Sequence, residues 1–341
     1  MMKIECIYVV CPGAFKTGGT ELAHQLVYKL NNKGINAKIT YSSSKNGVFM
    51  HPAFAEYIND YVKLNDIPDN ENTIIVFPET LTDLISNYSL ATIYVWWMSV
   101  DNYYNRRNMS LEVKEYGFPK AILSFFKSKV FFKKYGRRKY LPLSNMTNVK
   151  MHLVQSDYAF DFLKKNGITN VKYLTDYINK EYTERYSAID ITKKENYVIY
   201  NPRKGKLFTN KIIKSCPNIL FVPLQGMTNS QVIECMEKAK VYIDFGPHPG
   251  KDRMPREAAM MKCCIITGKR GSAAYEDVPI KEKYKFEDNP SNIKSIKKAI
   301  ENVLENYDIV VQDFQQYCDW IAKEEERFDK EIDDIFGLYE Q

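Results

Sequence analysis

The clearest structural signal in the chain is the sequence VYIDFGPHPGKDRMPREAAMM at residues 241–261. It opens with an apolar run typical of a buried strand at 241–245, and a loop with two prolines and two glycines follows. A helix then fits 255–261, because Pro255 suits the first helical position and Glu257 suits the first turn, where the helix dipole favours a carboxylate. A strand, a polar loop and a helix in succession form the repeating unit of parallel α/β sheets.

The same alternation of strand and helix patterns continues on both sides of this stretch. Nearly continuous apolar runs rich in β-branched residues predict strands that are covered by helices on both faces. The predicted strands span 4–10, 37–40, 73–77, 92–97, 151–155, 171–174, 197–200, 219–222, 241–245 and 264–267. The predicted helices span 20–31, 230–238 and 255–261, with a helical, aromatic-rich segment from about 308. A polar stretch at 184–196 indicates a linker, so we predict two doubly wound α/β domains.

Length and composition agree with two globular domains. The chain has 341 residues, of which 45% are hydrophobic and 26% charged, and its net charge is +6. Disorder is thereby excluded, and no apolar run reaches the roughly 18 residues that a membrane span needs. The seven cysteines form no Cys-x-x-Cys pair, so neither a zinc site nor a disulfide framework is predicted. We expect a cytoplasmic protein with reduced thiols, whose first residues form a strand and not a signal peptide.

The loop between the strand and the helix of the first stretch is rich in polar side chains. His248, Lys251, Asp252 and Arg253 follow the end of the strand, which is where ligands bind in parallel α/β sheets. So many polar groups in an ordered loop suit recognition of a polar, phosphorylated ligand. The alternative for Glu257 is a helix-start acid that binds no ligand.

A second glycine-rich turn, PGAFKTGGT at 12–20, joins the first predicted strand to the first predicted helix. It nearly matches a P-loop, but Gly19 stands where a P-loop has the lysine that reaches the outer phosphates, so a nucleotide hydrolase is not expected. Gly18 and Gly19 would let a ligand approach the backbone, and free N–H groups at the helix start favour an anion. A tight turn without a ligand is the alternative.

Three passages together resemble the GT-B glycosyltransferases, in particular the family 4 type that includes bacterial polysaccharide enzymes. Residues 12–23 are similar to that family's glycine loop and helix, and NPRKGK at 201–206 resembles its basic diphosphate loop. REAAMMKCCII at 256–266 is similar to its Glu-Ala-rich helix running into a buried strand. The resemblance implies a GT-B fold, with two Rossmann-like domains facing a cleft and a C-terminal helix packing back on the N-domain. The implied domains are 1–183 on the acceptor side, 184–311 for the nucleotide-sugar, and 312–341 as the C-terminal helix crossing back.

The resemblance also implies roles for individual residues. Glu257 matches the glutamate that binds the ribose hydroxyls of a nucleotide-sugar, and a carboxylate suits this task because it accepts from two vicinal hydroxyls. Arg203 matches the arginine of the diphosphate loop, and Lys206 fits its lysine, with Lys204 and Lys211 as alternatives. The residues assigned to the nucleotide-sugar are Gly18, Gly19, Gly226, Met227, His248, Gly250, Lys251, Asp252, Arg253 and Glu257.

Assignments to Gly226, Met227 and Asp101 rest on other parts of the chain. FVPLQGMT at 221–228 resembles the loop that holds the base through backbone groups, hence Gly226 and Met227. Asp101 follows the strand that ends at Trp97 and is assigned to acceptor or sugar recognition; helix capping beside an aromatic core is the alternative. The catalytic assignments are Arg203, Lys206 and Asp101.

The chain departs from the family motif Glu-x7-Glu at its first position. Pro249 stands there, so the usual contact to the donor sugar is absent or has moved to Asp252. The identity of the sugar therefore does not follow from the resemblance.

A basic stretch at 117–156 contains no Asp or Glu. Its positive residues are Lys120, Lys127, Lys129, Lys133, Lys134, Arg137, Arg138, Lys139 and Lys150, and aromatic residues interleave with them. Such a composition at 120–140 suits an anionic membrane surface. A solvated helix face with its aromatic residues in the core is the alternative, and nucleic acid is not expected because no recognisable binding module accompanies the charge.

The combined hypothesis is a glycosyltransferase that moves a sugar from a UDP, GDP or dTDP type of nucleotide-sugar to a glycan or lipid-linked acceptor. The resemblance implies retention of anomeric configuration, synthesis of a surface polysaccharide, no metal and no cofactor. The protein would be cytoplasmic, or peripheral on the inner face of the membrane. The alternatives are a non-catalytic nucleotide-sugar-binding module and a nucleotide-sugar epimerase on the same fold.

Overall fold

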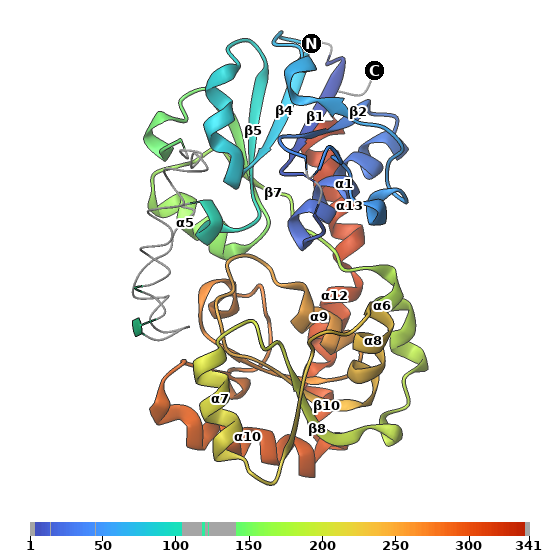
Figure 1. The fold of residues 1–341 in the computed structure, drawn as a ribbon, viewed down its shortest axis with the longest axis vertical. Coiled ribbons are helices and arrows are strands. Elements are labelled where there is room, and N and C mark those ends of the chain that lie inside the picture. The colour runs from blue at the N-terminus through green and yellow to red at the C-terminus, as the bar shows by residue number, and fades with distance from the viewer. Residues whose placement is uncertain are drawn as a thin grey trace. The chain divides into compact units, whose positions relative to one another are not determined.

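The computed structural model describes residues 4–13, 15–44, 46–103, 118–119, 122 and 141–337 (Figure 1). The described residues up to 103, with 141–176 and 326–337, form one compact unit, and 177–325 belong to a second. The basic residues from 120 to 139, to which the sequence assigns membrane binding, lie outside the described residues.

The first unit is built on a seven-stranded sheet in which every neighbouring pair is parallel. The strand order is β3-β2-β1-β4-β5-β6-β7, which winds in both directions from β1. Its strands are β1 (Cys6–Cys11), β2 (Ala37–Tyr41), β3 (Val62–Lys63), β4 (Thr73–Pro78), β5 (Thr92–Trp97), β6 (Val149–Val154) and β7 (Val171–Tyr173). Its α-helices are α1 (Gly18–Asn32), α2 (Val100–Tyr103) and α5 (Asp157–Lys165). Helices on both faces explain why all six residues of β4 are buried.

The second unit contains a five-stranded parallel sheet in the order β12-β11-β10-β8-β9. Its strands are β8 (Glu195–Tyr200), β9 (Leu220–Pro223), β10 (Ala239–Asp244), β11 (Cys264–Gly268) and β12 (Lys285–Phe286). Its helices are α6 (Lys180–Arg185), α7 (Lys206–Ser215), α8 (Asn229–Lys238), α9 (Arg253–Met260), α10 (Ile293–Glu305), α11 (Tyr307–Val310) and α12 (Gln315–Ala322). Helices α7 and α10 lie on one side of β8 and β10, and α8 and α9 lie on the other (Figure 1).

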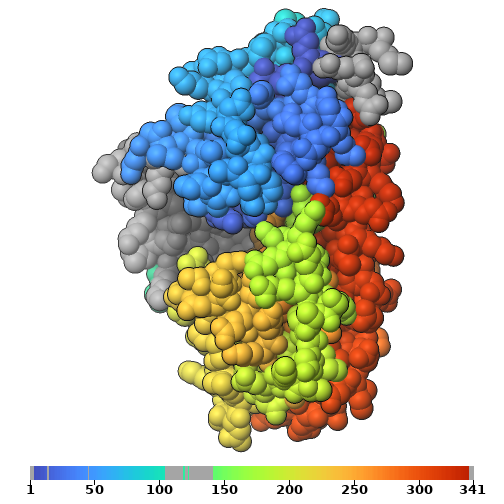
Figure 2. All heavy atoms as spheres, turned by 90° about the vertical axis from the view of Figure 1, so that its right-hand side faces the viewer, coloured from blue at the N-terminus to red at the C-terminus, as the bar shows by residue number. Residues whose placement is uncertain are grey.

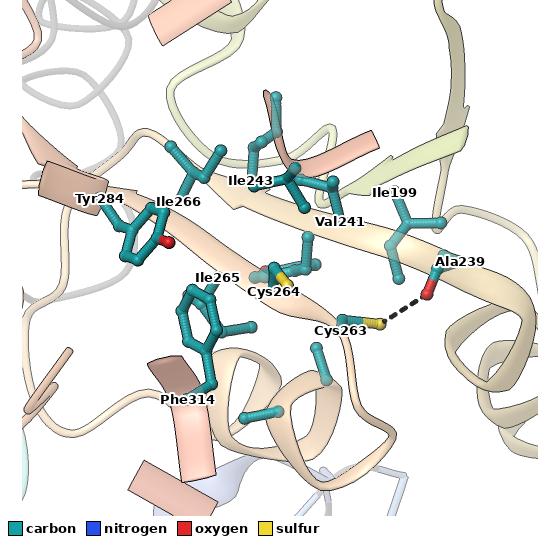
Figure 3. Close-up of a cluster of buried hydrophobic side chains, with 14 of the residues drawn as sticks. Ile199, Ala239, Val241, Ile243, Cys263, Cys264, Ile265, Ile266, Tyr284 and Phe314 are labelled. Carbon is teal, nitrogen blue, oxygen red and sulfur yellow. Dashed lines mark hydrogen bonds between the residues drawn. The ribbon is translucent and has the colours of Figure 1, made fainter. Parts of the chain in front are cut away.

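The core of the second unit is formed by the central strands and the helices that cover them. Ile199, Val241, Ile243 and Ile265 are at most 1% exposed, and they come from three adjacent strands (Figure 3). Cys263 donates its thiol hydrogen to the carbonyl oxygen of Ala239 at 3.4 Å, so this buried cysteine is a partnered core residue. All seven cysteines are free thiols, as the sequence predicts.

The C-terminal segment consists of two α-helices with a break at Lys323. Helix α12 ends at Ala322, and α13 (Glu324–Phe336) follows. The part of α13 from residue 326 onward belongs to the first unit, where its outer face reaches the surface beside N-terminal residues (Figure 2). Its Asp329 Oδ2 lies 3.0 Å from Lys29 Nζ of α1, and the ring of Phe328 stacks on that of Trp96 with centroids 6.4 Å apart. The prediction that the C-terminal helix packs back on the N-terminal domain is confirmed.

The doubly wound parallel α/β class is confirmed, with differences at some elements. The strands β3 and β12 and the helices α2, α5, α6, α7 and α10 were not predicted; β3, β12 and α2 have only two to four residues, too few to show a periodic pattern. The stretch predicted as a linker lies inside the second unit, where α6 and the start of β8 include part of it. The chain passes from the first unit to the second between Asp176 and Tyr177, whereas the sequence suggests a domain boundary at 183.

Helix α9 begins at Arg253, two residues before the predicted start. Pro255 is therefore not the first helical residue, and Glu257 lies in the second turn and not in the first. The proline still breaks no hydrogen bond, because the first four N–H groups of a helix have no partner within it. Among the described helices, none is both long and apolar enough to cross a membrane.

Replacing Phe328 by alanine should destabilise the first unit by about 3–5 kcal/mol, because the ring is fully buried and leaves a cavity. Urea unfolding measures this change. The control is Asp333→Asn, which removes an exposed ion pair with Lys33 from the same helix and should cost less than about 1 kcal/mol. Equal effects of the two substitutions would contradict the packing role of Phe328.

Candidate functional site

Three loops meet at the edge of the second sheet where β8, β10 and β11 end. Gly205 (φ +50°) lies so close to the next loop that a Cβ atom there would fall 1.2 Å from the carbonyl oxygen of Phe245. Gly271 (φ +59°) approaches the loop from the other side, where a Cβ atom would fall 2.0 Å from the carbonyl oxygen of His248. Only glycine fits at such distances, and glycine also adopts the positive φ without strain. The two glycines thus bring the polar loop after β10 into contact with its neighbours.

Lys204 joins two of these loops through its ammonium group. Its Nζ contacts the Oδ2 atom of Asp252 and lies 3.5 Å from Oδ2 of Asp244. Burial favours the neutral amine, but the charges of the two carboxylates outweigh it and raise the pKa of Lys204. Burial would likewise raise the pKa of Asp252, whereas the charges of Lys204 and His248 hold it well below its usual range. Lys204 and Asp252 therefore form an ion pair.

His248 is fully buried between the same two carboxylates. Its Nδ1 lies 2.8 Å from Asp252 Oδ2, and its Nε2 lies 3.7 Å from Asp244 Oδ1. The Tyr242 hydroxyl donates to Asp244 Oδ2 at 3.0 Å, and burial followed by this carboxylate raises the pKa of Tyr242 well above its usual value. Each of these side chains contacts at least one other, so the cluster is linked within itself.

The same cluster contains residue types that can bind a metal ion. Among the described residues, Asp244, His248 and Asp252 offer ligand atoms that all lie within 4.8 Å of one another. Lys204 already contacts the Oδ2 atoms of both carboxylates, so an ammonium group stands where a metal would have to bind. These residues fit an internal cation better than a metal.

The three basic residues of the loop after β8 have different surroundings. Arg203 is exposed, and its backbone N–H donates to Asn201 Oδ1 at 3.0 Å. Lys206 is the first residue of α7 and is exposed, as is Lys211 farther along the same helix. Of the lysines that the sequence offers for this loop, the structure brings Lys204 to Asp252 and Asp244. Sequence spacing could not distinguish them, because the direction of each side chain depends on the left-handed turn at Gly205.

The loop after β10 divides its polar groups between the cluster and the protein interior. Asp252 faces Lys204 and His248, whereas Lys251 Nζ lies 2.8 Å from the carboxylate of Glu324. The carbonyl oxygen of Gly250 accepts from the Ser272 hydroxyl at 2.6 Å. Arg253 and Glu257 are half-buried on α9.

The loop after β9 reaches the same edge of the sheet. Gly226 has φ +71° and open space around it, and Met227 is half-buried before the capping box that begins α8 at Thr228. The sequence did not reveal Asp244, Tyr242, Arg256 or Glu324 as parts of this region. Asp244 alone left a signal, because it is an acid at the end of an otherwise apolar strand.

In the first unit, the glycine turn after β1 packs on the loop after β2. A Cβ atom on Gly13 (φ +137°) would fall 2.5 Å from the carbonyl oxygen of Ser43. Helix α1 begins at Gly18 with Thr17 as its N-cap and Thr20 completing a capping box. A Cβ atom on Gly19 would lie 3.6 Å from the Met98 sulfur, so the helix start is close to the end of β5. Gly18 and Gly19 are thus the first two residues of a capped helix, which begins two residues before the predicted start.

Asp101 lies in α2 beyond the end of β5 and is half-buried. Its Oδ1 accepts a hydrogen bond from the Tyr158 hydroxyl at 2.9 Å. Near it is Glu79, a buried acid that the sequence analysis missed, whose Oε2 accepts from the backbone N–H of Met98 at 3.0 Å. Burial raises the pKa of Glu79 to about 8, although backbone N–H groups oppose the shift.

No protein-family model and no curated protein sequence matches the chain. Solved structures do match it. A glycosyltransferase from Rickettsia africae is similar over 98% of both chains, with a TM-score of 0.63 and 14% sequence identity. TarM is similar over 100% of this chain and 99% of its own, with a TM-score of 0.63 and 11% identity. Anabaena HepE, solved with UDP-glucose, is similar over 98% of this chain and 99% of its own, with a TM-score of 0.61 and 10% identity. At these identities the similarity shows the fold, and the GT-B fold predicted from the sequence is confirmed.

Replacing Gly205 by alanine should destabilise the second unit by at least about 3 kcal/mol, because the new methyl group would clash with backbone as well as adopt a left-handed conformation. Gly226→Ala is the matched control. It has a similar φ but open space, so it should cost only about 1–2 kcal/mol. Denaturant unfolding of both variants compares the two costs, and similar values would contradict the close contact at Gly205.

Glu79 should make stability depend on pH. The folded protein retains a proton on this carboxyl up to about pH 8, whereas the unfolded chain loses it near the usual value of 4.5. Stability from this group is therefore lost as pH rises from 4.5 to 8, by up to roughly 5 kcal/mol. Glu79→Gln resembles the protonated form and should remove this part of the pH dependence. Unfolding of both proteins across this range measures it, and parallel pH profiles would contradict a protonated Glu79.

Proposed function

We propose that the protein is a glycosyltransferase that moves a sugar from a nucleotide-sugar to a glycan or lipid-linked acceptor. The observation that carries this proposal is the ordered polar cluster at the carboxyl edge of the second sheet, in a fold shared with glycosyltransferases. HepE was solved with UDP-glucose, which supports a nucleotide-sugar of UDP type; GDP and dTDP types remain alternatives.

The chemical need of the reaction is to stabilise the charge that develops on the departing diphosphate. Pre-positioned cations and backbone N–H groups serve this purpose because they need no reorganisation as the bond breaks. Arg203 and Lys206 are exposed and available on the loop after β8, and Lys204 lies beside them in the cluster. We assign the diphosphate to this loop, with Lys204 added to the two residues chosen from the sequence.

The sugar nucleotide would be oriented by the loop after β10 and by α9. Glu257 is half-buried and is assigned to the ribose hydroxyls, for which its two oxygens are suited. Asp252 is assigned to the sugar in place of the glutamate that the chain lacks at Pro249. Its side chain is 22% exposed, so part of the carboxylate is accessible although Lys204 and His248 contact it.

The proposed transfer uses no metal and retains the anomeric configuration. Support for the first point is that Lys204 fills the cation position between Asp244 and Asp252. In a retaining transfer of this family the leaving phosphate oxygen helps to deprotonate the acceptor hydroxyl, so no strong protein base is required. A lipid-linked acceptor would be reached at a membrane surface, and the basic residues at 120–139 support docking on anionic lipid.

A thermal-shift screen with UDP, GDP, dTDP and UDP-glucose tests the donor site. We expect one nucleotide family to raise the melting temperature by several degrees, because a ligand at a hundredfold excess over its dissociation constant stabilises by about 2.7 kcal/mol. Glu257→Ala and Arg203→Ala should abolish the shift. Glu234→Ala and Arg185→Ala are matched controls, since both remove exposed charges from other parts of the same unit.

The outcomes separate the candidate functions. No shift with any nucleotide at millimolar concentration would overturn the proposed site. A shift that is insensitive to Glu257→Ala and Arg203→Ala would move the site elsewhere. Binding without release of UDP in the presence of any acceptor would favour a nucleotide-sugar-binding module over an enzyme.

A further inference from the structure

We propose that Arg256 and Glu324 form a positioning pair that fixes the shape of the loop after β10, residues 246–252. The proposal rests on the proposed function, because it assigns the pair to the nucleotide-sugar site without contact to the ligand. Neither residue is marked by the sequence motif, in which Glu257 is the residue expected to bind.

Arg256 holds the loop through two backbone carbonyl groups. Its Nε donates to the carbonyl oxygen of Asp252 at 3.1 Å, and its Nη2 donates to that of Lys251 at 3.1 Å. The remaining arm of the guanidinium, Nη1, donates to Glu324 Oε2 at 2.7 Å. The planar fork of an arginine can satisfy three such directions at once, which a lysine cannot.

Glu324 holds the guanidinium group of Arg256 and also forms an ion pair with Lys251 of the loop. Its Oε1 lies 2.8 Å from Lys251 Nζ, and that ammonium group lies 4.2 Å from the centre of the Trp320 ring. Arg256 and Glu324 are 0% exposed and Lys251 is 5% exposed. One carboxylate therefore pairs with two buried cations, one from the loop and one from α9.

Burying these charges is a poor way to gain stability. The desolvation of buried ion pairs often cancels their attraction, and apolar residues of similar size can stabilise as well or better. The buried charged residues instead fix the geometry of the loop, because Arg256 binds the carbonyl groups of Lys251 and Asp252. Ser272 holds the earlier part of the loop in the same way, through the carbonyl oxygens of His248 and Gly250.

The consequence is a fixed position for the side chains of His248 and Asp252. The loop contains two prolines and two glycines and has little regular hydrogen bonding of its own. Because Arg256 and Ser272 hold the carbonyl groups of this loop, the side chain of Asp252 stays in contact with Lys204. Glu257 is the next residue after Arg256 on α9. The pair also marks the start of α13, because Glu324 is the first residue of that helix.

The decisive variant is Arg256→Lys, which keeps the buried positive charge beside Glu324 but cannot reach both carbonyl oxygens. Hydrogen exchange of the full-length protein without ligand should be faster at the amides of residues 250–253. Binding of UDP-glucose, measured by calorimetry, should weaken roughly tenfold, which corresponds to ~1.4 kcal/mol. The matched control is Arg185→Lys, an arginine in the same unit that pairs with Glu181 and Glu237 on the surface and should change neither measurement.

A second variant, Glu324→Gln, keeps the shape of the side chain and protects the test if Arg256→Lys does not fold. It should produce the same faster exchange in the loop. Unchanged exchange in a folded variant would overturn the positioning pair, whatever happens to binding. If the unaltered protein binds no nucleotide, the proposed function fails and the pair loses its assigned ligand, whereas unchanged binding in Arg256→Lys overturns the pair alone.

Discussion

The contact between the loop after β8 and the loop after β10 is the constraint on which the candidate site depends. Gly205 lies against the carbonyl group of Phe245, closer than any residue with a side chain could lie. This approach brings Lys204 to the carboxylates of Asp244 and Asp252, and it sets the start of α7. A backbone contact between two loops thus determines which charged groups become neighbours.

The charged residues around the loop after β10 form two groups, one at the edge of the sheet and one in the protein interior. The first group, at the carboxyl edge of the sheet, contains Lys204, Asp252 and His248. The side chains of Lys204 and Asp252 are partly exposed, and that of His248 is buried. Behind, Arg256 and Glu324 are fully buried. The loop after β10 contributes to both groups, because Asp252 faces forward while the carbonyl groups of residues 251 and 252 are bonded from behind. A polar site whose side chains are to be held in fixed positions needs this kind of support from behind.

In the first unit, a close glycine contact, a helix cap and a single buried acid hold the loops at the end of the sheet. Its glycine turn packs on the loop after β2 at Gly13, and a capping box starts α1. Glu79 accepts a hydrogen bond from the backbone N–H of Met98 beyond the end of β5, and burial raises the pKa of this carboxyl. Residues of α13 complete the core of this unit by covering Trp96. A chain segment from the far end of the sequence is therefore part of the N-terminal unit.

The sequence by itself determined the α/β class, most strands within a few residues, and the loops that end at the two sheet edges. These follow from local patterns: apolar runs, glycines and prolines at turns, and a helix start. Only the tertiary structure decided that Lys204, and not Lys206, meets Asp252, that Lys251 turns inward to Glu324, and that α9 begins at Arg253. The reason is physical: a side chain's direction and partners depend on backbone turns and on residues distant in sequence, as Glu324 is from Arg256, and no local pattern records them.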